Sequence, residues 1–250
     1  MKLFEELVVE AEAADVTGWG FGYLDGRATE ERPPWGYARL LAERLAASLS
    51  ALDLDTGGGE VLDEAPALPP RMVATESWEP NLQRARERLG PRGVDVVRTV
   101  PGEPLPFSDG SFALVTARHP VRPAWSEIHR VLEPGGTYFA QHVGAESAFE
   151  LIEFFLGPLP EARRNRDAEL EADAARRAGL TVVDLRIARL RMEFFDVGAI
   201  VWILRKCVWW VPGFIVAEYE GKLRELDAQM RSGEPFVAHS RRHLIEARRS

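Results

Sequence analysis

The sequence predicts an α/β protein built on a doubly wound, mostly parallel sheet of seven strands. Two observations indicate this fold class. Short apolar runs alternate along the chain with segments whose apolar residues recur at helical spacing, as expected when helices connect parallel strands. The length of 250 residues suits one such domain with insertions, and 46% apolar and 28% charged residues are ordinary for a soluble globular protein.

The N-terminal part of the chain predicts a helical cap. Residues 1–15 have helical character, and residues 37–49 form a second helix with Tyr37 and Leu45 on one face. The segment between these helices combines several glycines with large aromatic side chains, which indicates irregular structure. We therefore expect residues 1–48 to form an N-terminal cap on the sheet.

The core of the predicted sheet follows this cap. Strands are expected in the apolar runs 51–54, 72–75, 94–97, 112–117, 137–143, 180–187 and 238–247. Helices are expected at residues 60–64, 80–89, 123–132 and 161–178. The core is thus residues 49–189 and 236–250, and residues 190–235 form an insertion before the last strand. Two helices, 197–211 and 216–231, are predicted inside this insertion, which has the size of a lid or substrate-binding layer.

The turn after the first core strand is the main candidate for a ligand site. Parallel sheets bind ligands beyond the carboxyl ends of their strands. The strand 51–54 passes through Asp53 and then runs into three consecutive glycines that begin at Gly57, where a ligand can approach the backbone closely. Glu76 ends the next strand, and an acid at that place is suited to accept hydrogen bonds from two ribose hydroxyls.

The same region resembles a known enzyme family. The sequence LDLDTGGGE at 52–60 is similar to the first motif of class I methyltransferases, which binds S-adenosylmethionine (SAM). Glu76 resembles their ribose-binding acid, LPFSDGSF at 105–112 resembles the entry into their fourth strand, and VLEPGG at 131–136 resembles the helix end before their fifth strand. The resemblance covers roughly residues 37–144. Within the family, the sequence is similar to a type 11-like bacterial branch, which implies no particular substrate.

The resemblance implies SAM as the cofactor and a seven-stranded Rossmann-like fold around it. The residues that it places at the cofactor are Asp53, Asp55, Thr56, Gly57, Gly59, Glu76, Ser77, Gly102, Glu103 and Arg118. A dinucleotide site is the rival interpretation of the glycine turn. It is disfavoured because the glycines are contiguous rather than spaced as G-x-G-x-x-G, and because two nearby aspartates would repel a diphosphate.

Three positions depart from the family pattern. Asp55 stands where the family usually has glycine, Pro101 stands where an aspartate often faces the adenine, and Ala113 stands where an acid is usual. Glu103 is either a substitute for the missing aspartate or a solvated loop acid. These departures keep open the hypothesis of a methyltransferase-like protein whose SAM site is impaired or diverted to another reaction.

His119 is the candidate catalytic residue. It follows the fourth core strand, at the edge of the sheet where acceptors bind in this fold, and an imidazole suits a general base at neutral pH. The alternative is a histidine that only forms local hydrogen bonds. Arg118 is a candidate to hold a substrate anion or the SAM carboxylate, whereas His142 is expected to be structural.

Metal binding is not expected from the spacing of the potential ligands. The five histidines are scattered without a pattern such as H-E-x-x-H; His239 and His243 are four apart, but on a predicted strand they lie some distance from each other. The single cysteine, Cys207, lies in an apolar run that favours a buried thiol. Aromatic residues of the cap and the insertion are expected to cover the site, with ordinary packing as the alternative. These residues are Trp19, Phe21, Tyr23, Trp35, Tyr37, Trp202, Trp209 and Trp210.

Charge and hydropathy limit the partners. A net charge of −8 argues against nucleic acid, so a small-molecule acceptor is favoured and an RNA methyltransferase is kept as the alternative. The apolar stretch 197–216 contains Arg205 and Lys206 at its centre, which argues against a membrane span. The acidic N-terminus is unlike a signal peptide, so a cytoplasmic location is expected. The apolar insertion suits a lid or the surface of a homodimer.

Overall fold

The computed structural model describes residues 2–18, 20–164 and 166–250. Its α-helices are α1 (Phe4–Ala13), α2 (Tyr37–Ala47), α3 (Glu60–Asp63), α4 (Glu79–Leu89), α5 (Trp125–Val131), α6 (Phe149–Leu156), α7 (Ala168–Arg177), α8 (Val197–Lys206) and α9 (Glu220–Arg231). Its strands are β1 (Ala28–Glu30), β2 (Ser50–Leu54), β3 (Arg71–Glu76), β4 (Asp95–Arg98), β5 (Phe112–Arg118), β6 (Leu132–Val143), β7 (Leu180–Phe194) and β8 (Phe236–Arg249).

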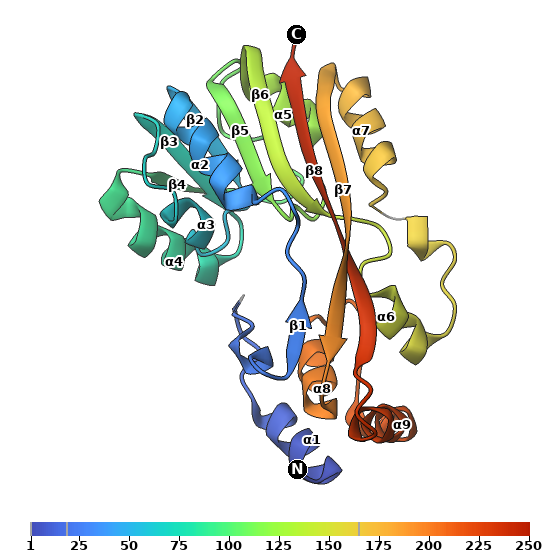
Figure 1. Cartoon of the computed structure of the whole chain (residues 1–250). Helices are drawn as coiled ribbons and strands as arrows, with labels where there is room; N and C mark the ends of the chain where they lie inside the picture. The colour runs from blue at the N-terminus through green and yellow to red at the C-terminus, as the bar shows by residue number, and fades with distance from the viewer. Residues whose placement is uncertain (1, 19, 165) are drawn as a thin grey trace. The chain divides into compact units, whose positions relative to one another are not determined.

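The strands form one sheet in the order β1-β7-β8-β6-β5-β2-β3-β4 (Figure 1). The strands from β2 to β6 pair in parallel, β8 is antiparallel to β6, and β1 is antiparallel to β7. The predicted α/β fold class is therefore confirmed, with an eighth strand added to the predicted seven. That strand, β1, is a three-residue edge strand in the segment that was expected to be irregular.

The chain divides into two compact units. The core unit contains residues 33–145, 166–188 and 242–250, and the helical unit contains residues 1–32, 146–165 and 189–241. The proposed cap of residues 1–48 is thus shared between the two units, and the proposed insertion 190–235 belongs to the helical unit together with α1 and α6. Strands β7 and β8 contribute residues to both units.

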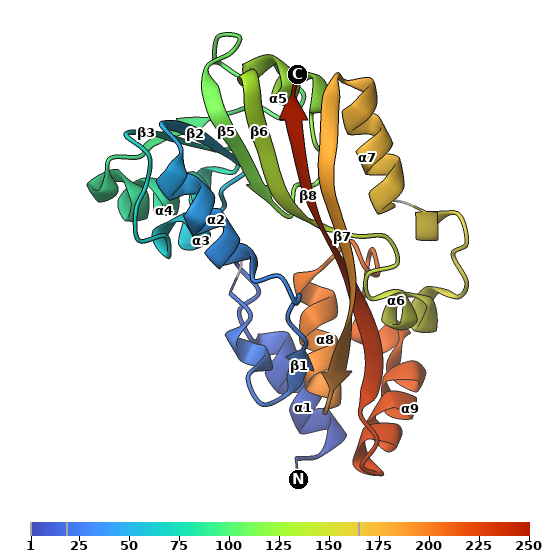
Figure 2. The ribbon, with the colours of Figure 1, turned by 45° about the horizontal axis from the view of Figure 1, so that its top comes forward.

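The sheet of the core unit is covered on both faces (Figure 2). On one face, Leu41 and Leu45 of α2 are buried with residues of α3 and α4 against the sheet. On the other face, Ala172 and Ala175 of α7 pack with residues of α5. Parallel strands buried on both faces have apolar side chains in nearly continuous runs, which explains why β2, β3 and β5 were predictable. The same arrangement leaves the carboxyl ends of these strands as the place for a ligand.

The helical unit is built around α8, which is buried along almost its whole length. Asp196 caps its first turn by accepting a hydrogen bond from the Ala199 amide at 2.9 Å. At its other end the Lys206 ammonium donates to the carbonyls of Val16, Thr17 and Gly18. The charges that interrupt the apolar stretch therefore hold the N-terminal segment within this unit. No helix among the described residues combines the length and apolar character needed to cross a bilayer.

Several predicted boundaries were wrong. The helix expected from residue 161 starts at Ala168, because the Asp167 side chain caps it by accepting from the amides of Glu169 and Leu170. The two helices of the insertion are shorter than expected: α8 ends at Lys206, and α9 begins at Glu220. Helix α6 was missed, because its apolar side chains follow one another with little of the polar spacing that reveals an amphipathic helix.

Candidate functional site

The glycine turn after β2 has a left-handed backbone at three positions. Asp55, Gly57 and Gly59 all have positive φ angles, of 53°, 66° and 82°. The Gly59 amide closes the turn by donating to the Thr56 carbonyl at 3.2 Å, and the Thr56 amide joins it to β3 by donating to the Thr75 carbonyl at 2.9 Å. A Cβ on Gly59 would lie 2.8 Å from the Leu89 side chain, so that glycine is required by packing on α4. A Cβ on Gly57 would meet nothing within 4 Å, so open space lies beside the backbone there.

Glu76 holds this turn in place. Its buried carboxylate accepts hydrogen bonds from the Gly57 amide at 2.9 Å and from the amides of Ser77 and Trp78, both at 2.8 Å. A carboxylate has about four acceptor positions, so roughly one remains. Glu76 therefore shapes the turn and can still accept a hydrogen bond from a ligand hydroxyl.

Two further carboxylates lie at the end of β2. Asp53 is buried and accepts a hydrogen bond from the Thr116 hydroxyl at 2.6 Å. Burial raises the pKa of Asp53 to about 6, although the Thr116 hydroxyl opposes this shift. The pKa of Asp55 is raised, mainly because its carboxylate loses solvent and secondly because of the negative charge of Glu76. The residue as a whole is nevertheless exposed. Three acids around one turn favour a positively charged ligand.

His119 lies at the end of β5 in a left-handed conformation with a φ of 59°. Its amide donates to the Gln141 carbonyl at 2.7 Å. The Trp35 indole N–H donates to Gln141 Oε1 at 2.8 Å, which turns the Gln141 amide group so that its Nε2 faces His119 Nε2 at 3.0 Å. Because an amide nitrogen only donates, His119 Nε2 is the acceptor and its proton lies on Nδ1.

This hydrogen-bond chain bears on the proposed role of His119. Burial, with smaller contributions from Arg242 and Arg118, lowers the pKa of His119 to about 2. The ring is therefore neutral at physiological pH and offers an N–H rather than a lone pair. Its role as a general base stays a prediction, and the geometry suits a hydrogen-bond donor better. Arg118 is exposed at the end of β5.

The structure brings together most of the residues that the resemblance implies. Asp53, Asp55, Thr56, Gly57, Glu76 and Ser77 surround the turn through the contacts described above. Gly102 and Glu103 lie in an exposed turn after β4. The segment that leads into this turn is held near the site by a hydrogen bond from the Thr99 amide to the Glu76 carbonyl at 3.2 Å. The Glu103 side chain is exposed there, and its part in a site stays a prediction.

Sequence reasoning missed the polar partners of these residues. Thr75 accepts a hydrogen bond from the Asp55 amide at 3.3 Å, Thr116 orients Asp53, and Gln141 orients His119. Each is a polar residue near the carboxyl end of an otherwise apolar strand. That position is the signal by which such partners can be found, because a buried polar side chain needs a hydrogen-bond partner.

The aromatic residues that were expected to cover the site pack locally. In the helical unit, Tyr23 stacks on Trp202 with ring centroids 5.4 Å apart, and Phe21 meets the same indole edge-on at 6.0 Å. In the core unit, Tyr37 stacks on Phe139 at 5.4 Å. Trp19 lies outside the described residues. An aromatic cover therefore stays a prediction, and the packing alternative accounts for the described contacts.

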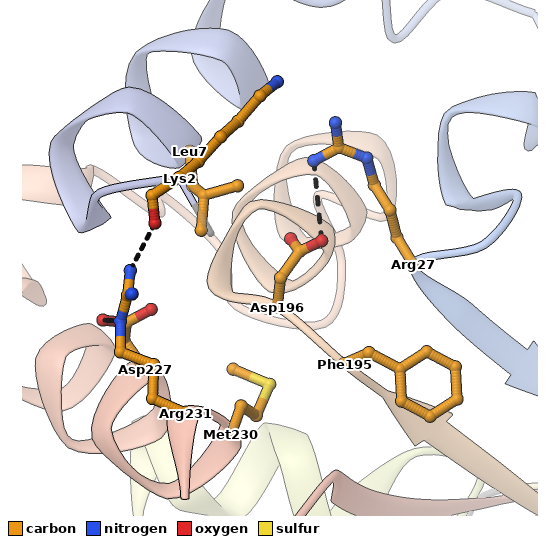
Figure 3. A pocket seen from close by; sticks show the side chains of 8 residues that line it. All are labelled: Lys2, Leu7, Arg27, Phe195, Asp196, Asp227, Met230 and Arg231. Carbon is orange, nitrogen blue, oxygen red and sulfur yellow. Dashed lines mark hydrogen bonds and ion pairs between the residues drawn. The ribbon is translucent and has the colours of Figure 1, made fainter. Parts of the chain in front are cut away.

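The helical unit contains a cavity of its own, of about 330 Å³ (Figure 3). It is lined by Lys2, Leu7, Arg27, Phe195, Asp196, Asp227, Met230 and Arg231. Its acids are already paired: Asp196 lies 3.6 Å from Arg27, and Asp227 accepts from Arg231 at 2.5 Å. Because both acids of the cavity are paired with arginines, the acids at the ends of β2 and β3 remain the candidate site.

Comparison with known proteins points to the same region. Residues 52–140 match the family model of the methyltransferase domain. A candidate methyltransferase from Bacillus halodurans superposes with a TM-score of 0.60 at 20% identity, over 84% of this chain and 97% of that chain. A candidate sarcosine dimethylglycine methyltransferase from Galdieria sulphuraria superposes with a TM-score of 0.53 at 14% identity, over 99% of this chain and 98% of that chain.

One structural neighbour has a different reaction in its name. The cyclase SpnF superposes with a TM-score of 0.55 at 19% identity, over 98% of this chain and 92% of that chain. At such identities the superpositions establish the fold and leave the reaction open. None of the curated proteins matches this chain.

Proposed function

We propose that this chain is a class I methyltransferase that binds SAM at the turn after β2 and transfers the methyl group to a small organic acceptor; the match of residues 52–140 to the methyltransferase domain and the shared fold support this proposal. The observation that carries the proposal is the set of three carboxylates, Asp53, Asp55 and Glu76, around a backbone turn that is open at Gly57. When bound, SAM supplies a methyl group on a positively charged sulfur, and its amino group carries a second positive charge.

The residues fit this cofactor by charge and by space. Glu76 is already oriented by three backbone amides, so it can accept from a ribose hydroxyl with little loss of side-chain entropy. Asp53 and Asp55 favour the cationic methionine end, and the absent Cβ of Gly57 leaves the backbone accessible. The ligand would thus contact acids and backbone from two neighbouring strands.

The acceptor side is assigned to the end of β5. His119 presents Nδ1–H, which orients an oxygen or nitrogen of the acceptor, and Arg118 can pair with an anionic group on it. An acceptor that is already deprotonated needs no general base. The chain charge of −8 supports a small molecule over nucleic acid.

Asp55 supports a second candidate function, a methyltransferase-like protein with a diverted site. It holds a left-handed conformation that glycine would adopt without strain, and its side chain brings a charge to the turn. In that case the fold serves another reaction, as the name of the neighbour SpnF indicates for that protein. Replacement of Asp55 by glycine distinguishes the two functions.

The proposal is tested by ligand-dependent thermal stability. SAM at about 100 times its dissociation constant stabilises a protein by about 2.7 kcal/mol, which raises Tm measurably. We expect this rise in the natural protein and its near loss in Glu76→Gln, because the neutral amide gives up one acceptor and donates instead. The matched control is Asp95→Asn, an exposed acid at the start of β4 and so at the other end of the sheet.

Two results would count against the proposal. An unchanged Tm in the natural protein at millimolar SAM would remove SAM as the cofactor of this site. An equal loss in Glu76→Gln and Asp95→Asn would show that the effect is not local to the turn. A SAM-dependent rise together with labelled methyl groups recovered in small-molecule products would establish the full activity.

A further inference from the structure

Three potential metal ligands meet on the face of the sheet that α7 covers. His142 of β6 and His243 of β8 are directly opposite each other in the antiparallel pair, with ring centroids 4.8 Å apart. Glu171 of α7 reaches both rings: its Oε2 lies 2.5 Å from His142 Nδ1 and 2.9 Å from His243 Nε2. Glu171 is 29 positions from His142 and 72 from His243, so the three side chains converge on one point that spacing alone does not reveal.

The cluster has the donor set of a zinc site. Two imidazole nitrogens and one carboxylate oxygen lie within 4.8 Å of one another, and zinc sites with two histidines and one glutamate keep a fourth position for water. Both imidazoles are buried, with 1% and 0% of their side chains exposed, whereas 16% of the Glu171 side chain is exposed. Solvent therefore reaches the cluster along Glu171, where a water ligand would sit.

A second contact prepares His142 to act as a ligand. Its other ring nitrogen, Nε2, lies 2.9 Å from the hydroxyl of Tyr138, which is buried. A metal-bound histidine usually donates its second N–H to an oxygen, and the tyrosine oxygen can accept it. The same hydroxyl can donate when Nδ1 carries the proton, so Tyr138 satisfies His142 with or without a metal.

We propose that His142, Glu171 and His243 form a binding site for a divalent transition metal, with Zn²⁺ as the favoured ion. Ligand atoms of a tetrahedral zinc ion are roughly 3.3 Å apart. The Glu171 oxygen, now 2.5 and 2.9 Å from the two ring nitrogens, therefore has to withdraw by less than about 1 Å, and the two nitrogens, which lie within 4.8 Å of one another, have to reach the same spacing. The Glu171 side chain, which is partly exposed on α7, can make its part of that adjustment. The histidine spacing in the sequence predicts no metal, because spacing does not show which residues strand pairing brings together; the present proposal therefore departs from that prediction.

The metal would tie α7 to the sheet on the side opposite His119. Successive side chains of a strand point to opposite faces, so Gln141, which contacts His119, and His142 serve different sites. Helix α7 otherwise contacts the sheet through small alanines. A bond from its Glu171 to two strands would add an anchor that these short side chains lack. This role is independent of the proposed methyl transfer.

The test is metal binding by chelator-treated protein whose fold is checked by circular dichroism. We expect about one Zn²⁺ per chain in calorimetric titration, and Co²⁺, used as a probe, to give the visible absorption of a four-coordinate ion. Tyr138→Phe should weaken binding about 10- to 100-fold, because it removes the oxygen behind His142. Glu171→Gln and His243→Gln should each abolish the stoichiometric site.

The matched control is His239→Gln. His239 lies four residues before His243 on the same strand and also contacts a carboxylate, Glu150, but Arg189 at 2.8 Å occupies the place of a third ligand. This variant should bind Zn²⁺ as the natural protein does. Absence of stoichiometric Zn²⁺ or Co²⁺ binding by the folded natural protein would overturn the proposal and leave a hydrogen-bonded His–Glu–His cluster, as would binding that survives Glu171→Gln.

Discussion

At the residue scale, the protonation of His119 is fixed by two neighbours. Trp35 can only donate, so it orients the Gln141 amide, and that amide in turn donates to His119 Nε2. A histidine was predictable at this edge of the sheet as a candidate for catalysis. Its partners were not, because Gln141 reaches His119 only through the pairing of β5 with β6, and Trp35, which is distant in sequence, acts through Gln141.

The His119 ring should not titrate near neutral pH. Burial lowers its pKa to about 2, so its NMR signals should stay constant from about pH 5 to pH 9. The resonance is assigned by comparison with His119→Gln. Titration near the ordinary histidine value would mean that the lone pair is free, and would restore the general-base role that the sequence suggests.

Asp53 should make both stability and cofactor binding depend on pH. Its pKa is raised from 3.8 to about 6 on folding, so the folded protein keeps a proton that the unfolded chain releases. The free energy of unfolding should therefore fall as pH rises through about 4 to 6, by up to about 3 kcal/mol. Affinity for a cationic ligand should rise over the same window, because the carboxylate ionises.

Urea unfolding at several pH values measures how the free energy of unfolding depends on pH, and ligand titration measures how the affinity does. Asp53→Asn should flatten both of these dependences, because the amide does not titrate. A stability that is independent of pH between about 4 and 6 in the natural protein would contradict the buried, proton-holding state of Asp53.

At the scale of elements, two glycines of the turn after β2 have different roles: Gly59 is needed for packing and Gly57 for ligand binding. Gly59→Ala should lower the free energy of unfolding by about 2–4 kcal/mol, because its Cβ would clash with Leu89, which is buried and cannot move aside. Gly57→Ala should cost only about 1 kcal/mol for its positive φ, yet weaken SAM binding at least about tenfold. Chemical denaturation measures the loss of stability, and calorimetry measures the loss of SAM affinity. Equal losses in both variants would contradict the separate roles of Gly57 and Gly59.

The elements that the sequence predicted well are those with one clear driving force. The buried strands β2, β3 and β5 are continuous apolar runs, and α2 and α4 have one apolar face. The elements that were missed depend on tertiary contacts. Strand β1 exists because residues 28–30 pair with the extended end of β7, and α6 carries apolar side chains on most of its surface.

At the scale of the whole molecule, the sequence predicted the fold class but not how the helices group. Length and alternation predicted one sheet with helices on both faces, and the structure and the methyltransferase domain match confirm that fold. The grouping of α1 with α8 was not visible in the sequence, since it depends on side chains such as Arg205, which donates to the carbonyl of Ala14 at 3.1 Å. A small-molecule partner, a cytoplasmic location and a homodimer stay predictions.

The most direct test of the central claim is calorimetric titration of the natural protein and of Asp55→Gly with SAM and with its demethylated product. We expect micromolar binding of both ligands to the natural protein, since Asp53, Asp55 and Glu76 together favour a cation at the open turn. We also expect weaker SAM binding in Asp55→Gly, because one attractive charge is removed. No binding to the natural protein, with binding gained by Asp55→Gly, would contradict the account and indicate a site diverted from methyl transfer.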